Sequence, residues 1–331
     1  MRVMVVDDSR TIRKLLSITL KSKVELVEEI VECVSGEVAL RKLEDINVDL
    51  ILLDVLMDGM DGYETCKKIK EHPKLKNISV IFLTSKADEE DIIKGFEVGG
   101  VDFITKPFRE AELVARVNTH LKLQKLQDNV IEKNQTEIVM KMGEIAELRS
   151  KETGNHVKRV AEYCYLLAYL HGLDEKHCQI LYAASPMHDI GKVALEDSIL
   201  NKAGSLSDEE VKIMQKHTVL GYEMFSDSKG DILSAAAIMA HEHHEKFDGT
   251  GYPRGISGNK IHIYGRIVAL ADVFDALASD RVYKKGWSID RIVELFISEK
   301  SKHFDPYLVD IFVKNIDKFI AIKKEFNDNF T

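Results

Sequence analysis

The segment Leu50-Ile51-Leu52-Leu53-Asp54 decides the fold of the first third of this chain. It is a short apolar run that ends in a carboxylate, and such runs are typical of buried strands in a parallel sheet. Similar runs lie at residues 3–6, 80–83 and 103–104, and stretches with helical spacing lie between them at residues 10–20, 37–43 and 63–69. This alternation predicts an α/β domain, an open, doubly wound parallel sheet of five strands with helices on both faces.

Polar residues follow the predicted strands at the edge where such a sheet binds its ligand. Asp7 and Asp8 close the first strand, Asp54 closes the third, Thr84 closes the fourth and Lys106 follows the fifth. Three converging carboxylates would repel one another unless they hold a hard cation such as Mg²⁺. Asp54 would then be a nucleophile able to accept a phosphoryl group, with Thr84 and Lys106 placed to contact its oxygens.

Four motifs resemble those of the response-regulator receiver domain, over residues 1–123: VVDDS at 5–9, LLDVLMDGMDG at 52–62, FLTSK at 82–86 and DFITKPF at 102–108. The resemblance implies that Asp54 is phosphorylated by a sensor histidine kinase. It also implies that Asp7, Asp8 and Asp54 bind Mg²⁺, and that Thr84, Lys106 and Phe103 form the switch. The chain departs from the family at Asp58, where proline is usual; this adds a carboxylate near the metal and removes no catalytic group.

From residue 110 the pattern becomes wholly helical. Apolar residues recur at spacings of three, four or their sums, with one polar interruption at Asn134; they are Leu123, Leu126, Val130, Ile138, Met142, Ile145 and Leu148. This pattern predicts one long helix over residues 110–151, whose narrow apolar stripe fits a two-stranded coiled coil in a homodimer. The alternative is that the stripe packs on the chain's own domains. We expect a helical linker at residues 124–150 and an all-helical domain at residues 151–331.

The expected helical domain carries histidines and carboxylates in a pattern typical of metal ligands. His188 and Asp189 are adjacent, and Glu152 and His156 are four residues apart, which places both on one face of a helix. Further along the chain come His217, His241, His243, His244 and Asp272. Imidazole and carboxylate without thiolate favour Mn, Fe, Ni or Zn, and an aspartate can bridge two such ions.

The second half also resembles the HD-GYP subfamily of HD-domain phosphohydrolases, from residue 153 to 307. The motifs are SPMHDIGK at 185–192, HTVLG at 217–221, HHEKFDGTGYP at 243–253 and RIVALADVFDA at 266–276. The resemblance implies metal ligation by His156, His188, Asp189, His217, His243, His244 and Asp272, with Asp189 as the bridging, catalytic carboxylate. Glu152 matches a position that helps to hold a third metal in part of the family. Two or three divalent metals are therefore expected, Fe or Mn before Zn or Ni; His241 stays unassigned.

The resemblance implies a substrate as well, cyclic di-GMP, cut to linear pGpG and, with a third metal, to GMP under the control of Asp54 phosphorylation. Lys192, Arg281 and Lys284 match positions that contact substrate phosphates, which suits the general affinity of Lys and Arg for such oxygens, and Lys192 is expected to act in catalysis. The glycine-rich turn with Gly251-Tyr252-Pro253 is expected to shape the mouth of the site and its partner contacts, with the GGDEF domains of diguanylate cyclases as candidate partners.

Three alternatives to cyclic di-GMP hydrolysis stay open at this point. A scaffold that acts through the receiver domain and coiled coil alone is the one without a nucleotide, and the other two involve a cyclic dinucleotide. One is a receptor that binds a cyclic dinucleotide without turnover, although every matched ligand position is intact in this chain. The other is a hydrolase of a mixed cyclic GMP-AMP, since no residue in the sequence discriminates guanine from adenine.

The composition narrows the partners and the location. The formal charge of −9 over 331 residues argues against a general nucleic-acid binder, which needs a basic face. No apolar run approaches the ~20 residues that span a bilayer, and no signal peptide precedes the first strand. The four cysteines lack the CxxC spacing of metal or redox sites, which suggests reduced thiols. We therefore expect a cytoplasmic protein without membrane insertion.

Overall fold

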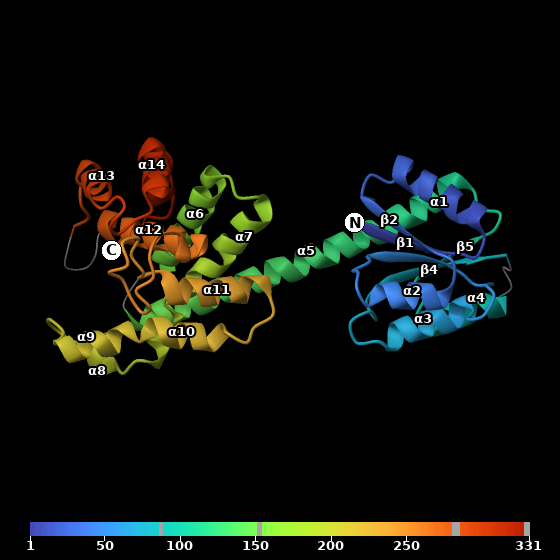
Figure 1. Cartoon of the computed structure of the whole chain (residues 1–331), viewed down its shortest axis with the longest axis horizontal. Helices are drawn as coiled ribbons and strands as arrows, with labels where there is room; N and C mark the ends of the chain where they lie inside the picture. The colour runs from blue at the N-terminus through green and yellow to red at the C-terminus, as the bar shows by residue number, and fades with distance from the viewer. Residues whose placement is uncertain (86–88, 151–153, 280–284, 328–331) are drawn as a thin grey trace. The chain divides into compact units, whose positions relative to one another are not determined.

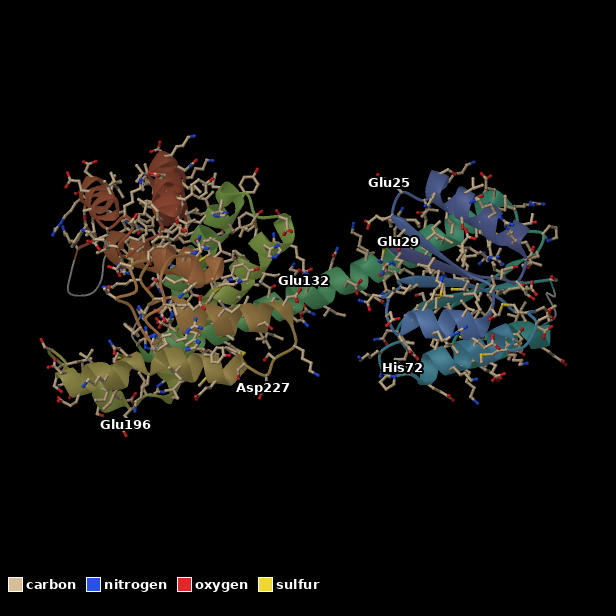
Figure 2. The ribbon with its side chains drawn as sticks, in the orientation of Figure 1. Glu25, Glu29, His72, Glu132, Glu196 and Asp227 are labelled. Carbon is tan, nitrogen blue, oxygen red and sulfur yellow. The ribbon has the colours of Figure 1, made fainter. Side chains whose placement is uncertain are left out.

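A computed structural model describes residues 1–85, 89–150, 154–279 and 285–327. The chain divides into two compact units, Met1–Glu132 and Lys133–Thr331. Glu132, the last residue of the first unit, is labelled in Figure 2, which draws the side chains along the ribbon.

The first unit is a parallel sheet with helices on both faces, as predicted (Figure 1). The strand order is β2-β1-β3-β4-β5. The strands are β1 (Arg2–Val6), β2 (Glu29–Cys33), β3 (Leu50–Asp54), β4 (Ser79–Thr84) and β5 (Asp102–Thr105). The helices are α1 (Arg10–Lys23), α2 (Gly36–Leu43), α3 (Gly62–Glu71), α4 (Glu89–Glu97) and the first part of α5 (Glu110–Arg149).

Apolar side chains fix both helical layers on this sheet. Leu16 of α1 and Leu113 of α5 are fully buried against one face, while Ala39 of α2 and Cys66 of α3 are fully buried against the other. Because all strands run parallel, their carboxyl ends meet at one edge. The residues that follow β1, β3, β4 and β5 are thereby brought to the same place.

The second unit is built from helices, with no sheet among its described residues. Its elements are the last part of α5, α6 (Gly154–His171), α7 (Glu175–Ala184), η1 (Ser185–Met187), η2 (Ile190–Ala194), α8 (Asp197–Leu200), α9 (Asp208–Gln215), α10 (His217–Phe225), α11 (Asp231–Glu242), η3 (Gly258–Lys260), α12 (Ile263–Ala278), α13 (Ile289–Ser298), α14 (Pro306–Lys314) and α15 (Ile316–Glu325). Aromatic residues from α6, α12 and α14 pack edge to face at its centre, with ring centroids 5.0 Å apart for both Tyr163–Phe274 and Phe274–Phe312. The expected all-helical second half is confirmed.

Helix α5 is a single helix of 40 residues, as the apolar spacing predicted. All seven apolar residues of its predicted stripe are exposed, with exposed fractions between 44% and 68%. A different face of the same helix is buried in the second unit, where Val139 and Ala146 lie in the apolar core. Of the helices in the described residues, none is long and apolar enough to cross a membrane.

Candidate metal centre

His188 and Asp189 lie where the chain leaves one short 3-10 helix and enters the next. His188 ends η1 and Asp189, with φ −103° and ψ 10°, precedes η2. This break lets two adjacent side chains serve one site, which a continuous helix would hinder. Gly191 then lies directly against α10, because a Cβ there would be 1.9 Å from the carbonyl oxygen of His217. Because Gly191 has no side chain, the His188-Asp189 segment can pack closely against the helix that carries His217.

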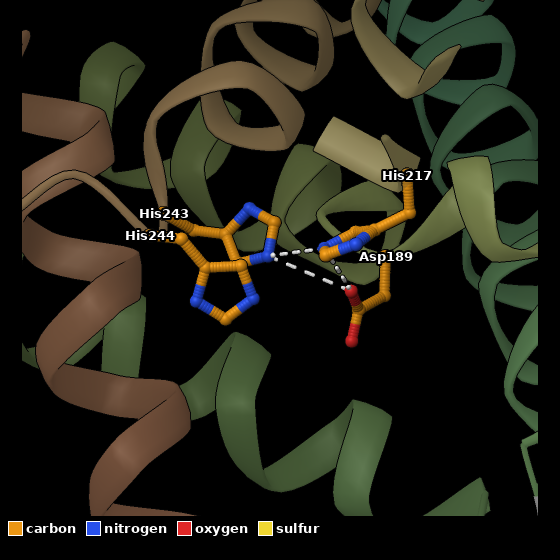
Figure 3. A group of neighbouring side chains, drawn as sticks. All are labelled: Asp189, His217, His243 and His244. Carbon is orange, nitrogen blue, oxygen red and sulfur yellow. Dashed lines mark hydrogen bonds and ion pairs between the residues drawn. The ribbon is translucent and has the colours of Figure 1, made fainter. Parts of the chain in front are cut away.

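Asp189 is the centre of the first group of ligand atoms (Figure 3). Its Oδ1 lies 3.2 Å from Nε2 of His217 and 3.5 Å from Nε2 of His243. The ring of His244 lies 4.0 Å from that of His243 and 5.1 Å from that of His217, centroid to centroid. One ligand atom from each of these four residues falls within 4.8 Å of the other three. The packing of α10 against α11 brings His217 to the histidine pair.

A second group surrounds His188. Nε2 of His188 lies 3.4 Å from Oδ2 of Asp189 and 3.8 Å from Oδ1 of Asp272, and Nε2 of His156 lies 3.7 Å from the same Asp272 oxygen. Glu147, near the end of α5, also belongs here, since its carboxylate and the two imidazoles offer ligand atoms within 4.8 Å of one another. The structure thus brings together seven of the eight residues predicted to bind metal. It adds Glu147, which the sequence reasoning missed.

Three imidazoles, those of His188, His217 and His243, are oriented by a hydrogen bond from the nitrogen that faces away from the site. Nδ1 of His188 donates to the carbonyl oxygen of Ser185 (2.8 Å), and Nδ1 of His217 donates to that of Met214 (2.7 Å). Nδ1 of His243 does the same toward Met239 (3.0 Å). A carbonyl oxygen can only accept, so the proton is on Nδ1 and Nε2 keeps a free lone pair in the neutral ring. This orientation is the usual one for metal-binding histidines.

His156 is oriented by a carboxylate instead. Its Nδ1 lies 2.8 Å from Oδ2 of Asp275, and Arg159 donates to both oxygens of the same carboxylate, at 2.6 and 2.9 Å. All three residues are at most 3% exposed. Burial by itself raises the pKa of Asp275, but its hydrogen bonds with His156 and Arg159 outweigh this and lower it. Asp275 therefore stays ionised and fixes the ring of His156.

The electrostatics keep Asp189 ionised and two of the histidines neutral. Burial raises the pKa of Asp189, but the charges of Lys192 and His188 outweigh this and hold it well below its usual value. Burial lowers the pKa of His217 to about 4, and burial together with the charge of His243 holds the pKa of His244 well below its usual value. The ionised carboxylate and these two neutral imidazoles are in the protonation state that metal binding requires. Burial lowers the pKa of His188, but Asp189 outweighs this and raises it to about 10, so a metal ion would have to displace the proton on this ring.

Unpartnered polar atoms show that this donor set fits divalent metals. His188 and Asp189 are only 1% and 6% exposed, and two of their atoms, Nε2 of His188 and Oδ1 of Asp189, are buried without a hydrogen bond. A buried polar atom without a partner carries a cost that a bound cation would remove. Nitrogen and oxygen donors without thiolate suit Mn, Fe, Ni or Zn.

The residues predicted to bind substrate are only partly described. Lys192 lies beside the centre, with Nζ 2.5 Å from Oδ2 of Asp189. Tyr252 stacks on His244, with ring centroids 4.7 Å apart, and Gly251 lies against the backbone of residues 244–246, where a Cβ would be 2.2 Å from the amide nitrogen of Lys246. The Tyr252–Pro253 peptide bond is cis. Three predicted site residues, Glu152, Arg281 and Lys284, lie outside the described residues.

His241 lies away from both groups of ligand atoms. Its ring stacks on Tyr222 of α10, with centroids 4.3 Å apart. It belongs to neither group of converging ligand atoms. The residue that the motifs left unassigned therefore packs between two helices.

The first unit presents its own acidic group at the carboxyl ends of its strands. Asp7, Asp8 and Asp54 offer oxygens within 4.8 Å of one another, and the group does not include Asp58. Nζ of Lys106 lies 2.7 Å from Oδ2 of Asp7 and 2.8 Å from Oδ2 of Asp54. Burial raises the pKa of Asp54, while Lys106 opposes the shift. This pocket places an anionic nucleophile beside a cation that can hold a phosphoryl oxygen.

The two predicted switch residues Thr84 and Phe103 line one pocket in the first unit. Phe96 also lines it and meets Phe103 edge to face, with ring centroids 6.3 Å apart. Two of the three predicted switch residues therefore face the same pocket.

Comparisons with known proteins identify a family for each of the two units. The family model of the HD domain matches residues 141–308, and that of the response regulator receiver domain matches residues 3–118. A probable cyclic di-GMP phosphodiesterase of Vibrio cholerae is 38% identical over 89% of this chain and 74% of its own length. The cyclic di-GMP phosphodiesterase response regulator RpfG of Xanthomonas campestris is 35% identical over 81% of this chain and 75% of its own length. The 3'3'-cGAMP-specific phosphodiesterase 2 of Vibrio cholerae is 38% identical over 81% of this chain and 52% of its own length.

Proposed function

Since the chain belongs to the HD-domain family and carries a response regulator receiver domain, we propose that it is a two-component response regulator whose HD domain hydrolyses cyclic di-GMP. Two relatives with this activity in their names, those of Vibrio cholerae and Xanthomonas campestris described above, align over about three quarters of their own length. The product is linear pGpG, with further cleavage to GMP if a third metal is held. A sensor histidine kinase is the proposed donor of the phosphoryl group to Asp54.

One observation carries this proposal: the convergence of Asp189, His217, His243 and His244 on a single point, with buried donor atoms left unpartnered. Two or three divalent metals, Fe or Mn first, are proposed to be held by this group and by the group around His188. When bound, such ions lower the pKa of water and stabilise the charge that develops on a phosphoryl group.

The chain's own residues supply the rest of the chemistry. Lys192 stays protonated because the Asp189 carboxylate raises its pKa against the effect of burial. Its Nζ is therefore a cation beside the centre, able to pair with a phosphodiester oxygen and offset charge in the transition state. Tyr252 presents an aromatic face next to His244, on the loop that is proposed to shape the mouth of the site.

Two substrates are compared in the test of this proposal. The metal-loaded protein is incubated with cyclic di-GMP and, separately, with 3'3'-cGAMP, and the products are resolved by chromatography over time. We expect cyclic di-GMP to be cut faster and pGpG to form first. Faster cleavage of cGAMP would assign the chain to the second substrate, which one relative's name supports. Binding of either without cleavage, in fully loaded protein, would make the chain a receptor.

Phosphorylation at Asp54 is expected to change the hydrolysis rate. The phosphoryl group brings negative charge next to Lys106 and Thr84. This charge is expected to change the conformation of the pocket that Thr84 and Phe103 line. A small-molecule phosphoryl donor should change the rate of the wild type about fivefold or more. It should leave Asp54→Asn unaffected. Asp58→Asn is the matched control, because Asp58 is exposed and outside the acidic group, so it should respond like the wild type. A response that persists in Asp54→Asn would exclude Asp54 as the phosphorylation site.

The exposed stripe of α5 supports a homodimer. We expect light scattering to give twice the 37.5 kDa chain mass. The reason is that the exposed apolar residues on one face of α5 leave water when they pack against the same face of a second copy. The pair of changes Ile138→Glu and Ile145→Glu places charge in the stripe and should return the mass to 37.5 kDa. Ile297→Glu on α13 is the control, since Ile297 is 52% exposed outside the stripe. A wild type that stays monomeric at micromolar concentration would contradict this expectation.

A further inference from the structure

The end of α5 is built directly onto the segment that carries His188 and Asp189. A Cβ at Gly143 would lie 2.6 Å from both Cβ and the carbonyl oxygen of Pro186, so the helix backbone touches the residues just before His188. Arg149 donates to the carbonyl oxygens of Val193 and Leu195, just after it. The last turns of α5 therefore hold the segment on both sides.

Between these two contacts, α5 inserts a carboxylate into the site. Glu147 is 1% exposed. Its Oε2 accepts a hydrogen bond from the hydroxyl of Ser150 at 2.7 Å and lies 3.9 Å from Nζ of Lys192. Its Oε1 is buried and has no hydrogen-bond partner. One oxygen is thus held in place by the helix itself, while the other is available.

Lys192 does not account for the burial of Glu147. Its Nζ is 2.5 Å from Asp189 and only 3.9 Å from Glu147, so its charge is directed mainly to Asp189. A buried carboxylate without a close cation is strongly destabilising. A cation is the partner that removes this cost.

Two further ligand atoms point to the same place. Nε2 of His188 is also buried without a hydrogen bond, and His156 contributes the third atom within 4.8 Å. Each imidazole is already oriented through its Nδ1, by Ser185 and Asp275 respectively. Two oriented imidazoles and one carboxylate oxygen form a set of donors that Mn and Fe accept.

We propose that Glu147 is a metal ligand and that, with His156 and His188, it forms a metal position beside the one around Asp189, His217, His243 and His244. This deepens the proposed function, on which it rests for the expectation that metals bind at all. The assignment also means that α5, which begins in the receiver domain, itself supplies a ligand. A displacement of α5 along its axis would then move the Glu147 carboxylate and so alter the occupancy of this metal position directly, with no other element required to move.

Metal stoichiometry tests the assignment independently of catalysis. The full chain is purified anaerobically, reconstituted with Mn²⁺, freed of excess metal and analysed by elemental mass spectrometry. Glu147→Gln keeps the side-chain shape and the acceptor oxygen for Ser150 but loses the anionic ligand. We expect it to hold about one metal fewer per chain than the wild type, or to bind that metal at least about tenfold more weakly.

Glu144→Gln is the matched control. Glu144 lies one turn earlier on α5, where it pairs with Lys141 at 2.8 Å, and its replacement should leave the metal content at the wild-type value. Should Glu147→Gln fold poorly, Glu147→Asp keeps the charge and withdraws the oxygens by one methylene group. It is expected to weaken the same metal by at least about tenfold.

The outcomes separate this inference from the proposed function. Wild-type stoichiometry and affinity in Glu147→Gln, or unchanged affinity in Glu147→Asp, overturn the ligand assignment even if hydrolysis is lost. Loss of one metal in Glu147→Gln supports the assignment even if the wild type fails to cut cyclic di-GMP, in which case the proposed activity alone falls.

Discussion

The Asp189→Asn variant is expected to lose cyclic di-GMP hydrolysis, with kcat lower by on the order of a thousandfold or more. Oδ1 of Asp189 faces His217 and His243, whereas its Oδ2 faces Lys192 and His188. An asparagine carries no charge and has only one acceptor oxygen. It can therefore offer an oxygen either to the His217 and His243 side or to the Lys192 side, but not to both. Its NH₂ group would face either the Lys192 ammonium or the metal position.

Steady-state hydrolysis and metal content are measured together on the same preparation. We expect Asp189→Asn to lose both, because the carboxylate stands between the two groups of ligand atoms. Asp231→Asn is the control, as Asp231 forms an exposed pair with Lys176 on the surface of the same domain. Such exposed pairs contribute little, about 0–1 kcal/mol. Full metal content together with turnover near the wild-type rate in Asp189→Asn would refute the central role given to this residue.

The Asp275→Asn variant is expected to show the largest loss of stability. Asp275 is 1% exposed and receives two hydrogen bonds from Arg159 while it orients His156. Removing one partner of a buried, hydrogen-bonded ion pair costs about 3–5 kcal/mol, because the opposite charge stays buried. For a domain of this size the cost corresponds to a fall of about 6–20 °C in Tm.

Thermal unfolding of the metal-free protein measures this effect without a contribution from metal binding. Asp310→Asn is the matched control, because it removes an aspartate that pairs with Lys300 on the surface, at 65% exposure. Its Tm should change by no more than a few degrees. A Tm of Asp275→Asn within about 2 °C of the wild type would show that the network around Arg159 contributes little to stability.

Sequence patterns were sufficient to predict strands and helices whose residues interact mainly with their neighbours in the sequence. The apolar runs at β1, β3 and β4 are recognisable because a central strand buried on both faces needs continuous apolar residues. At the edge strand β5 only the short run Phe103-Ile104 marks the strand. Edge strand β2 escapes prediction because it pairs only with β1 and its burial is incomplete, so Glu29 and Glu32 interrupt the run. The long helix α5 is predictable because its apolar spacing persists over many turns.

Contacts between distant residues set the limit of prediction at the site. Asp275 meets His156 across 119 positions of sequence, and nothing in the local pattern around either residue distinguishes it from a second aspartate at Asp272. In the sequence, Glu147 cannot be distinguished from the other acidic residues of this charged helix. Its burial depends on the close approach of Gly143 to Pro186, which only the folded chain shows.

By itself the sequence determined the two fold classes and the acidic edge of the sheet, because residue type and spacing act locally. The histidine and aspartate residues proposed as metal ligands came from the resemblance of the motifs to a known family. The tertiary structure alone decided that three histidines, His188, His217 and His243, present Nε2 to the site. It also decided which neighbours each oxygen of Asp189 faces, and that Glu147 of α5 lies in the group around His188. The physical reason is that a ligand is defined by the direction and burial of one atom. Both depend on the packing of helices that are far apart in the chain.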